Sequence, residues 1–256
     1  MSAAPRFTGP NPASRKRLPG LTKREGLLQH PWDDENGVRT SGLVVGRHLK
    51  TGHPHDRHAT AYYGIAPSVF EAVVKRWQRT NPAAPMQHTS FIDIGSGMGR
   101  GVLLASLLPF RQVMGVELHP ALMRIAQANR RVWKKQGRAL CPIRLVQGDA
   151  VQFPFPQGPC LALLFNPFGA FVLRRWLRMI SSEFANRPGE LDVLYVNCEQ
   201  EHVFEMQRGF SRLFLGKVRR SLADSTADRL ILNNQPDGEY ASAPYEDCSI
   251  WRWLAR

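Results

Sequence analysis

The chain of 256 residues lacks any long hydrophobic run, since no stretch approaches the roughly 18 consecutive apolar residues of a transmembrane helix. Its first 24 residues also lack the apolar run of a signal peptide. They hold six Lys or Arg and no acid, so a transit peptide is one alternative, but they are rich in Pro and Gly and show no helical period. We therefore predict a disordered basic arm over residues 1–30 and no membrane span.

Cysteine is scarce, with four residues at positions 141, 160, 198 and 248. They are far apart in the sequence, and no Cys-x-x-Cys pair is present. The pattern indicates neither a disulfide framework nor a cysteine zinc site, and it is typical of a protein in the reducing cytoplasm.

Acidic residues are few compared with basic ones, because 21 Asp and Glu stand against 34 Lys and Arg, for a net charge of +13. The arm carries six of these positive charges, so residues 25–256 carry +7. Such a balance attracts polyanions through long-range fields. A nucleic acid, an acidic protein or a membrane surface would fit it, and so would a basic surface with no specific partner.

Strand and helix patterns alternate from residue 90 onward, after an N-terminal extension over residues 31–85 whose one predicted helix covers residues 67–80. This alternation predicts βαβ units and a parallel sheet in a domain over residues 86–256. Strands are expected at 90–94, 113–117, 143–147, 161–165 and 191–197, and helices at 100–108, 119–136 and 170–185. Two last strands, at 211–218 and 248–254 with no convincing helix between them, predict an antiparallel hairpin at the sheet edge.

A glycine loop follows the first of these strands and opens a helix. Gly95, Gly97 and Gly99 allow a sharp turn and the close approach of a ligand. A dinucleotide fingerprint would place its third glycine at position 100, where this chain has Arg100. Asp93 stands two residues before the loop. An acid there can meet a cationic amino group and would repel a pyrophosphate, so the loop favours S-adenosylmethionine (SAM) over NAD.

Acidic residues also follow the next two strands. Glu117 ends the second strand, 22 residues after Gly95, where a carboxylate can accept hydrogen bonds from both hydroxyls of a ribose. Gly148, Asp149 and Ala150 follow the third strand. Asp149 is placed to accept a hydrogen bond from the amino group of an adenine, or to lie beside that group. The alternatives are that Asp149, like Asp93, caps a helix or turn and that Glu117 is a surface acid.

The fourth strand ends in Asn166, Pro167 and Phe168, over the expected position of a methyl donor. All these motifs together, over residues 60–255, resemble those of class I SAM-dependent methyltransferases. The chain looks most like a largely uncharacterised bacterial group with similar stretches at residues 37–42 (Gly-Val-Arg-Thr-Ser-Gly) and 63–67 (Tyr-Gly-Ile-Ala-Pro). The loop and Gly-Val-Glu motifs also look like those of Dot1-type protein lysine methyltransferases.

This resemblance implies a Rossmann-like fold, with a seven-stranded, mostly parallel sheet of order 3-2-1-4-5-7-6 and an antiparallel last strand. It implies SAM as the cofactor, with Tyr63 closing over it. The residues expected to contact SAM are Asp93, Gly95, Gly97, Glu117 and Asp149, with their neighbours Ser96, Gly99 and Ala150.

One departure concerns the acceptor side. Methyltransferases that act on the amino group of adenine or glutamine carry Asn/Asp-Pro-Pro-aromatic, and this chain is one proline short at Asn166-Pro167-Phe168. Asn166 is our candidate for positioning the substrate, with Pro167 and Phe168 beside it. The alternative is a strand-end turn with Phe168 in the core. No general base can be identified, and methyl transfer needs none in every case.

Three hypotheses remain open. The first is an N-methyltransferase that acts on a protein or nucleic acid, with a small-molecule methyltransferase as its alternative. The second is a nucleic-acid-binding protein with a degenerate SAM fold, in which residues 15–17 (Arg-Lys-Arg) contact phosphates. The third is a zinc site at His53, His55 and His58. Because no Cys accompanies these histidines, no metal is expected.

Overall fold

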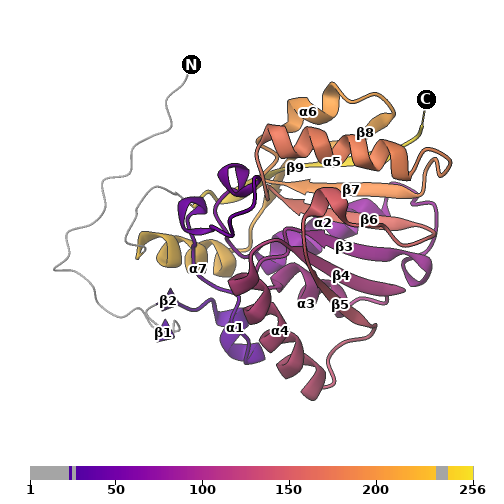
Figure 1. The fold of residues 1–256 in the computed structure, drawn as a ribbon. Helices are drawn as coiled ribbons and strands as arrows, with labels where there is room; N and C mark the ends of the chain where they lie inside the picture. Colours follow the sequence, from indigo (N-terminus) through magenta and orange to yellow (C-terminus); the bar gives the residue numbers. More distant parts are fainter. Residues whose placement is uncertain (1–22, 25–26, 235–241, 256) are drawn as a thin grey trace.

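The computed structural model describes residues 23–24, 27–234 and 242–255, so most of the predicted basic arm lies outside the described residues. A seven-stranded sheet with helices on both faces forms the centre of the described chain (Figure 1). Its strands are β3 (Ser90–Ile94), β4 (Gln112–Glu117), β5 (Ile143–Gln147), β6 (Cys160–Phe165), β7 (Leu191–Val196), β8 (Phe210–Arg219) and β9 (Tyr245–Trp253).

The remaining elements surround this sheet. A separate two-stranded ribbon pairs β1 (Lys23–Arg24) with β2 (Leu27–Leu28). The helices are α1 (Pro31–Asn36), α2 (Pro67–Gln78), α3 (Arg100–Ser106), α4 (Pro120–Lys135), α5 (Ala170–Glu183), α6 (Glu201–Glu205) and α7 (Leu222–Asn233). Single 3₁₀ turns are η2 (Gly46–His48), η3 (Asp56–His58), η4 (Met86–His88) and η5 (Ala150–Gln152).

The order of the strands in the main sheet is β5-β4-β3-β6-β7-β9-β8. Parallel pairs join β5 through β7, whereas β9 runs antiparallel to both of its neighbours, β7 and β8. Counted along the chain, this is the expected order 3-2-1-4-5-7-6 with an antiparallel last strand. The predicted Rossmann-like fold is therefore confirmed, and so is the antiparallel pair of strands at the sheet edge.

Both faces of the sheet are buried, because successive side chains of a strand point to opposite faces. Phe91 of β3 packs in a cluster with α2 and α3, whereas the next residue, Ile92, packs in a second cluster with α5 and α6. Helix α4 lies beside α3, where Trp133 packs against Leu103. The carboxyl ends of the parallel strands are left free of these helices, and loops gather there.

Helix α7 corrects the prediction that no helix lies between the last two strands. Ser221 caps its first turn by accepting a hydrogen bond from the Asp224 backbone N–H at 3.0 Å. Two acids one turn apart, Asp224 and Asp228, are among the residues that this helix buries. A buried face that includes carboxylates gives no apolar period, and this is why the pattern missed the helix.

The segment before α2 is also more ordered than its polar, Gly-rich sequence suggested. Helix α1 begins at Pro31, and the His30 ring caps it by accepting a hydrogen bond from the Trp32 backbone N–H at 3.1 Å. Gly37 ends it in the left-handed conformation, with φ of 64°. The segment from α1 to α2 and helix α7 lie side by side at one edge of the sheet (Figure 1). None of the described helices is long and apolar enough to cross a membrane.

Candidate functional site

A cavity of about 110 Å³ opens at the carboxyl ends of β3, β4, β5 and β6. Its floor comes from the ends of these strands and its cover from residues 49–65 of the N-terminal extension. All three predicted acids line it or its rim, namely Asp93, Glu117 and Asp149. Because parallel strands bring their carboxyl ends to one edge, residues from distant parts of the sequence meet there.

The glycine loop turns beneath this cover. Gly95, Gly97 and Gly99 all have positive φ, at 74°, 54° and 92°. A Cβ atom on Gly97 would lie 2.1 Å from Cε2 of Tyr62, and one on Gly95 would lie 2.4 Å from Cβ of Pro167. Only glycine therefore fits at these two positions, where the loop is pressed between the extension and the end of β6.

Glu117 fixes the shape of this loop. Its Oε2 accepts a hydrogen bond from the Gly97 backbone N–H at 2.8 Å, and its Oε1 accepts one from the His119 backbone N–H at 2.7 Å. Burial raises the pKa of this carboxyl, while the two N–H donors act in the opposite direction. The side chain is buried and directed into the cavity, so the alternative of a surface acid does not apply.

Asp93 lies deeper and has no cationic partner in the described part of the chain. Burial, and then the neighbouring Glu117 carboxylate, raise its pKa to about 7, against a hydrogen bond from the Val102 backbone N–H that lowers it. A Cβ atom on Gly101 would lie 2.5 Å from Oδ2 of Asp93, so the carboxylate packs directly on the start of α3. A buried acid of this kind favours binding of a cation, because a nearby positive charge restores its ionised form.

Asp149 has two roles in the structure. Its Oδ1 accepts a hydrogen bond from the Val151 backbone N–H at 3.0 Å and so caps η5, which agrees with the alternative from the sequence. Its Oδ2 faces Nδ1 of His55 at 3.1 Å. Ala150, the next residue, lines the cavity as well.

Besides Nδ1 of His55, two buried polar atoms at the cavity have no hydrogen-bond partner among the described residues. They are Oγ of Ser96, in the glycine loop, and Nδ1 of His119, directly after β4. Buried polar atoms usually form a hydrogen bond, because leaving such an atom without a partner costs about 1–3 kcal/mol. Both atoms are available to a polar ligand.

Asn166 has the strained left-handed conformation, with φ of 41°. Its backbone oxygen accepts a hydrogen bond from the Thr60 hydroxyl, and its Oδ1 accepts one from the Tyr195 hydroxyl at 3.2 Å. Since the Tyr195 oxygen itself accepts the Gln200 backbone N–H at 3.1 Å, its proton is directed to Asn166. Phe168 is buried in the core and also lines the cavity.

Two adjacent tyrosines line the cavity. The predicted Tyr63 lines the cavity, and its hydroxyl donates a hydrogen bond to Oδ1 of Asp228 in α7 at 2.6 Å. The ring against Gly97 belongs instead to Tyr62, whose hydroxyl donates to the Thr40 backbone oxygen at 2.7 Å. Tyr62 was not predicted to lie at the site, because the sequence marks it only by its position next to Tyr63.

Arg100 is a further residue whose role the sequence did not indicate. It is 2% exposed, and Nη2 lies 3.4 Å from Oδ1 of Asp33, which is fully buried in α1. Nε donates to the Thr40 hydroxyl at 2.6 Å, and Nη2 donates to the Ser41 hydroxyl at 2.8 Å. The position that excluded a dinucleotide fingerprint thus anchors the N-terminal extension on the glycine loop.

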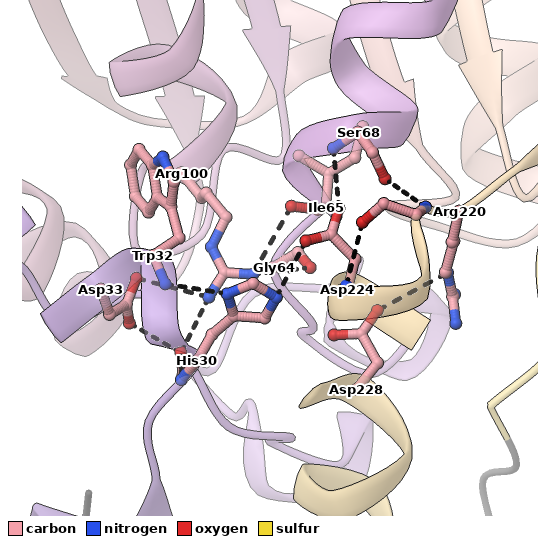
Figure 2. A network of polar contacts seen from close by, with 12 residues as sticks. His30, Trp32, Asp33, Gly64, Ile65, Ser68, Arg100, Arg220, Asp224 and Asp228 are labelled. Atoms are coloured by element: carbon pink, nitrogen blue, oxygen red, sulfur yellow. Dashed lines mark hydrogen bonds and ion pairs between the residues drawn. The ribbon is translucent and has the colours of Figure 1, made fainter. Parts of the chain in front are cut away.

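A second set of contacts joins the extension to α7 (Figure 2). Oδ2 of Asp224 accepts the Ser68 backbone N–H at 2.8 Å, and its Oδ1 lies 3.5 Å from Nε2 of His30. Although burial opposes it, hydrogen bonds from His30 and Ser68 lower the pKa of Asp224 to about 2. Nearby, Nε of Arg220 lies 3.5 Å from Oδ2 of Asp228. The cover of the cavity is therefore attached at both ends.

No known family profile and no curated protein sequence matches the chain. Among solved structures, the cyclase SpnF is similar with a TM-score of 0.50 and 17% identity, over 74% of this chain and 82% of that one. A SAM-dependent methyltransferase from Thiobacillus denitrificans in complex with S-adenosylhomocysteine has a TM-score of 0.45 and 14% identity, over 74% and 93%. Magnesium protoporphyrin IX methyltransferase from Synechocystis with bound SAM has a TM-score of 0.47 and 12% identity, over 73% and 79%.

The likeness to SpnF agrees with the strand order in assigning a Rossmann-like fold. It does not assign an activity, because a shared fold does not imply a shared function. Function has to be argued from the residues around the cavity.

Proposed function

We propose that the protein is a SAM-dependent methyltransferase whose acceptor is a nucleic acid. The observation that carries the first part is the convergence of Asp93, Glu117 and Asp149 on one cavity, each from the end of a different adjacent strand. None of these strands supplies a basic side chain that pairs with the three acids among the described residues. Three such acids suit a ligand that offers a cation, a ribose and an amino-bearing base. SAM carries all three.

The residues present fit this cofactor. Asp93 would meet the cationic amino group, Glu117 the ribose hydroxyls, and Asp149 with Ala150 the adenine edge. The unpartnered Ser96 hydroxyl and the backbone of the glycine loop would bind the remaining polar atoms. When bound, SAM supplies an electrophilic methyl group on a sulfonium.

The protein's own contribution is alignment and exclusion of water. Tyr62 and Tyr63 cover the cavity, and the Gln200–Tyr195–Asn166 chain of hydrogen bonds orients the Asn166 amide. Both oxygens of Asn166 already accept a hydrogen bond, so its amide nitrogen is the group left to position an acceptor. Ligand pockets usually measure about 300–1,000 Å³. Because the cavity of about 110 Å³ is smaller than this, we expect residues 49–65 to move outward on binding.

A surface beside the cavity supports a nucleic acid as the acceptor. Helix α5 begins directly after the Asn166-Pro167-Phe168 turn, and its exposed face presents a stripe consisting of Phe171, Arg174, Arg175 and Arg178, which we call the α5 stripe. Phe171 is 44% exposed. No acid lies within the stripe, so its charge is complementary to a phosphate backbone.

The aromatic end of the α5 stripe is the end nearest the cavity. The His58 ring stacks on Phe171, with ring centroids 4.7 Å apart and planes at 21°, and the Arg175 guanidinium lies 5.9 Å from the same ring. His55, which lines the cavity, has its ring centroid 6.5 Å from that of Phe171. Proteins that bind single-stranded nucleic acids use such surfaces, because bases stack on the exposed rings and phosphates contact the arginines beside them.

The first experiment measures SAM binding by calorimetry and methyl transfer from labelled SAM to fractionated nucleic acid and protein. We expect binding, and label in the nucleic acid fraction. Asp93→Asn should weaken binding about 10–100-fold, and the matched control Glu71→Gln, an exposed acid paired with Lys75, should bind as the wild type does. Absence of SAM binding by the wild type would refute the methyltransferase and favour a degenerate fold, whereas label only in protein or small molecules would refute the nucleic acid.

The second experiment tests the α5 stripe by fluorescence anisotropy with labelled single-stranded RNA at several salt concentrations. Replacing its three arginines with glutamine should reduce the slope of log K against log salt by about 2, because each phosphate contact on a single strand contributes about 0.7. The matched control removes the same charge from an exposed part of α4 with Arg131→Gln, Lys134→Gln and Lys135→Gln. Equal effects of the two triple variants would mean that the net charge, not the stripe, binds RNA.

A further inference from the structure

Two imidazoles and a carboxylate meet at the rim of the cavity. Oδ2 of Asp149 lies 3.1 Å from Nδ1 of His55 and 3.9 Å from Nε2 of His53. All three atoms lie within 4.8 Å of one another. The third histidine of the sequence pattern, His58, is not in this group and stacks on Phe171 instead. In the structure, the candidate site therefore consists of His53, His55 and Asp149, without His58.

Both sides of this cluster are held in place by the backbone. The Asp56 carboxylate accepts hydrogen bonds from the Thr51 backbone N–H at 2.6 Å, the Thr51 hydroxyl at 2.8 Å and the Gly52 backbone N–H at 2.8 Å. These bonds close residues 51–56 into a fixed turn that carries both histidines. On the other side, the bond from the Val151 N–H to Oδ1 orients the Asp149 carboxylate. The three groups therefore face one another before any ligand binds.

The His55 ring is buried without adequate compensation. The residue is 9% exposed, and its Nδ1 makes no hydrogen bond of acceptable geometry to any described residue, although Oδ2 of Asp149 is 3.1 Å away. Such an atom calls for an explanation, because a buried polar atom without a partner is costly. An ion between the nitrogen and the carboxylate would satisfy both.

The donor set is that of a zinc-type ion. Neutral imidazole nitrogens and carboxylate oxygens bind Zn²⁺ at about 2.0–2.2 Å, and three such ligands with one open position are usual in sites that are not purely structural. Tetrahedral ligands at those distances lie about 3.4 Å apart. The 3.1 Å between Asp149 and His55 is already close to this value, whereas His53, at 3.9 Å from Asp149, has to move inward.

His53 is free to make that rotation, because its side chain is 31% exposed. At present its Nδ1 accepts the His55 backbone N–H at 3.2 Å. Ligation through Nε2 would place the ring proton on Nδ1, so this long contact would be exchanged for the bond to the ion.

We infer that His53, His55 and Asp149 form a binding site for one divalent transition-metal ion of zinc type, with an open position toward the cavity. The ion would tie residues 51–58 to the end of β5 and so hold one side of the cover in place. This site does not depend on the proposed methyl transfer, although it shares Asp149 with the proposed cofactor site.

The test uses the full chain, stripped of metal with a chelator and titrated with Co²⁺ and then with Zn²⁺. We expect one Co²⁺ per chain with the visible absorption of tetrahedral coordination, displaced by Zn²⁺. His53→Gln and His55→Gln should each weaken binding by more than the about 10–100-fold typical of losing an outer-shell partner. His58→Gln is the matched control from the same segment and should bind as the wild type does.

Two outcomes would overturn the site: no stoichiometric Co²⁺ or Zn²⁺ at micromolar concentrations, or equal binding by the wild type and His55→Gln. Circular dichroism of each stripped variant shows whether it is folded, and His53→Gln, at the more exposed position, gives a second reading if His55→Gln is not. Asp93→Asn should bind the metal normally while binding SAM more weakly. Failure of the metal site and failure of the methyltransferase proposal are therefore distinguishable.

Discussion

The pH dependence of SAM binding follows directly from Asp93. Its pKa of about 7, raised by burial and then by Glu117, means that the unliganded protein holds a proton there below neutral pH. The difference from the ordinary value of 3.8 corresponds to a cost of about 4 kcal/mol for ionising this carboxyl in the folded protein. A ligand that presents a cation to Asp93 must displace that proton, so its affinity is linked to pH.

The affinity for SAM should fall on both sides of neutral pH. Below pH 7 the affinity for SAM should fall about tenfold for each pH unit, because one proton is released per ligand bound. Above about pH 8 it should fall again as the α-amino group of the ligand loses its charge. The unliganded protein should itself lose stability as the pH rises from about 4 to 7, since its folded state binds the proton more tightly than its unfolded state does.

Calorimetry between pH 5.5 and 8.5, in buffers of different ionisation enthalpy, measures both the affinity and the proton release. We expect about 0.9 protons released per SAM at pH 6 for a group of pKa about 7. Asp93→Asn should bind about 10–100-fold more weakly at pH 7.5, the loss of one charge-assisted hydrogen bond. The affinity of this variant for SAM should also no longer rise between about pH 5.5 and 7 (the rising limb of the wild-type profile), although Glu117 and His119 titrate in the same cavity. A wild-type affinity independent of pH from 5.5 to 7.5 would refute the reasoning, and so would an unchanged rising limb in Asp93→Asn.

Two further predictions concern stability, measured by urea unfolding. Gly97→Ala should cost more than about 2 kcal/mol, because φ is 54° and the new Cβ would lie 2.1 Å from the Tyr62 ring, whereas Gly148→Ala, with nothing within 4 Å, should stay within about 0.5 kcal/mol. Arg100→Ala should cost about 3–5 kcal/mol, because it leaves the fully buried Asp33 without its cation. Equal stabilities of the two glycine variants would contradict the first prediction, and a loss below about 1 kcal/mol for Arg100→Ala would contradict the second.

The sheet and the floor of the cavity could be predicted because their signals are local. The strands at 90–94 and 143–147 agree with the structure at both ends. The first is a buried apolar run, and the second, at the sheet edge, mixes partly buried apolar residues with exposed polar ones. The acids at the strand ends follow from the same pattern, because strand order fixes which ends are neighbours. That they meet at one cavity is a consequence of the fold, and their contacts with SAM stay a prediction.

The cover of the cavity could not be predicted, because its signals are long-range. Helix α7 buries Asp224 and Asp228, which contact His30 and Tyr63 more than 160 positions away. A carboxylate on a helix reads as a solvent-exposed residue unless its distant partner is known. The same holds for α1, whose buried Asp33 is paired with Arg100, 67 positions away.

Arg100 joins these two parts of the molecule. It opens α3 directly after Gly99, so its guanidinium leaves from the same turn that carries the glycine loop. Its contacts run to the backbone oxygen of Gly64 and to Asp33, both in the extension that covers the cavity. Any outward movement of residues 49–65 therefore pulls on the helix that begins at the loop. Asp33→Asn should consequently weaken SAM binding without touching the cavity, and thermal shift with and without SAM can separate that coupling from a plain loss of stability.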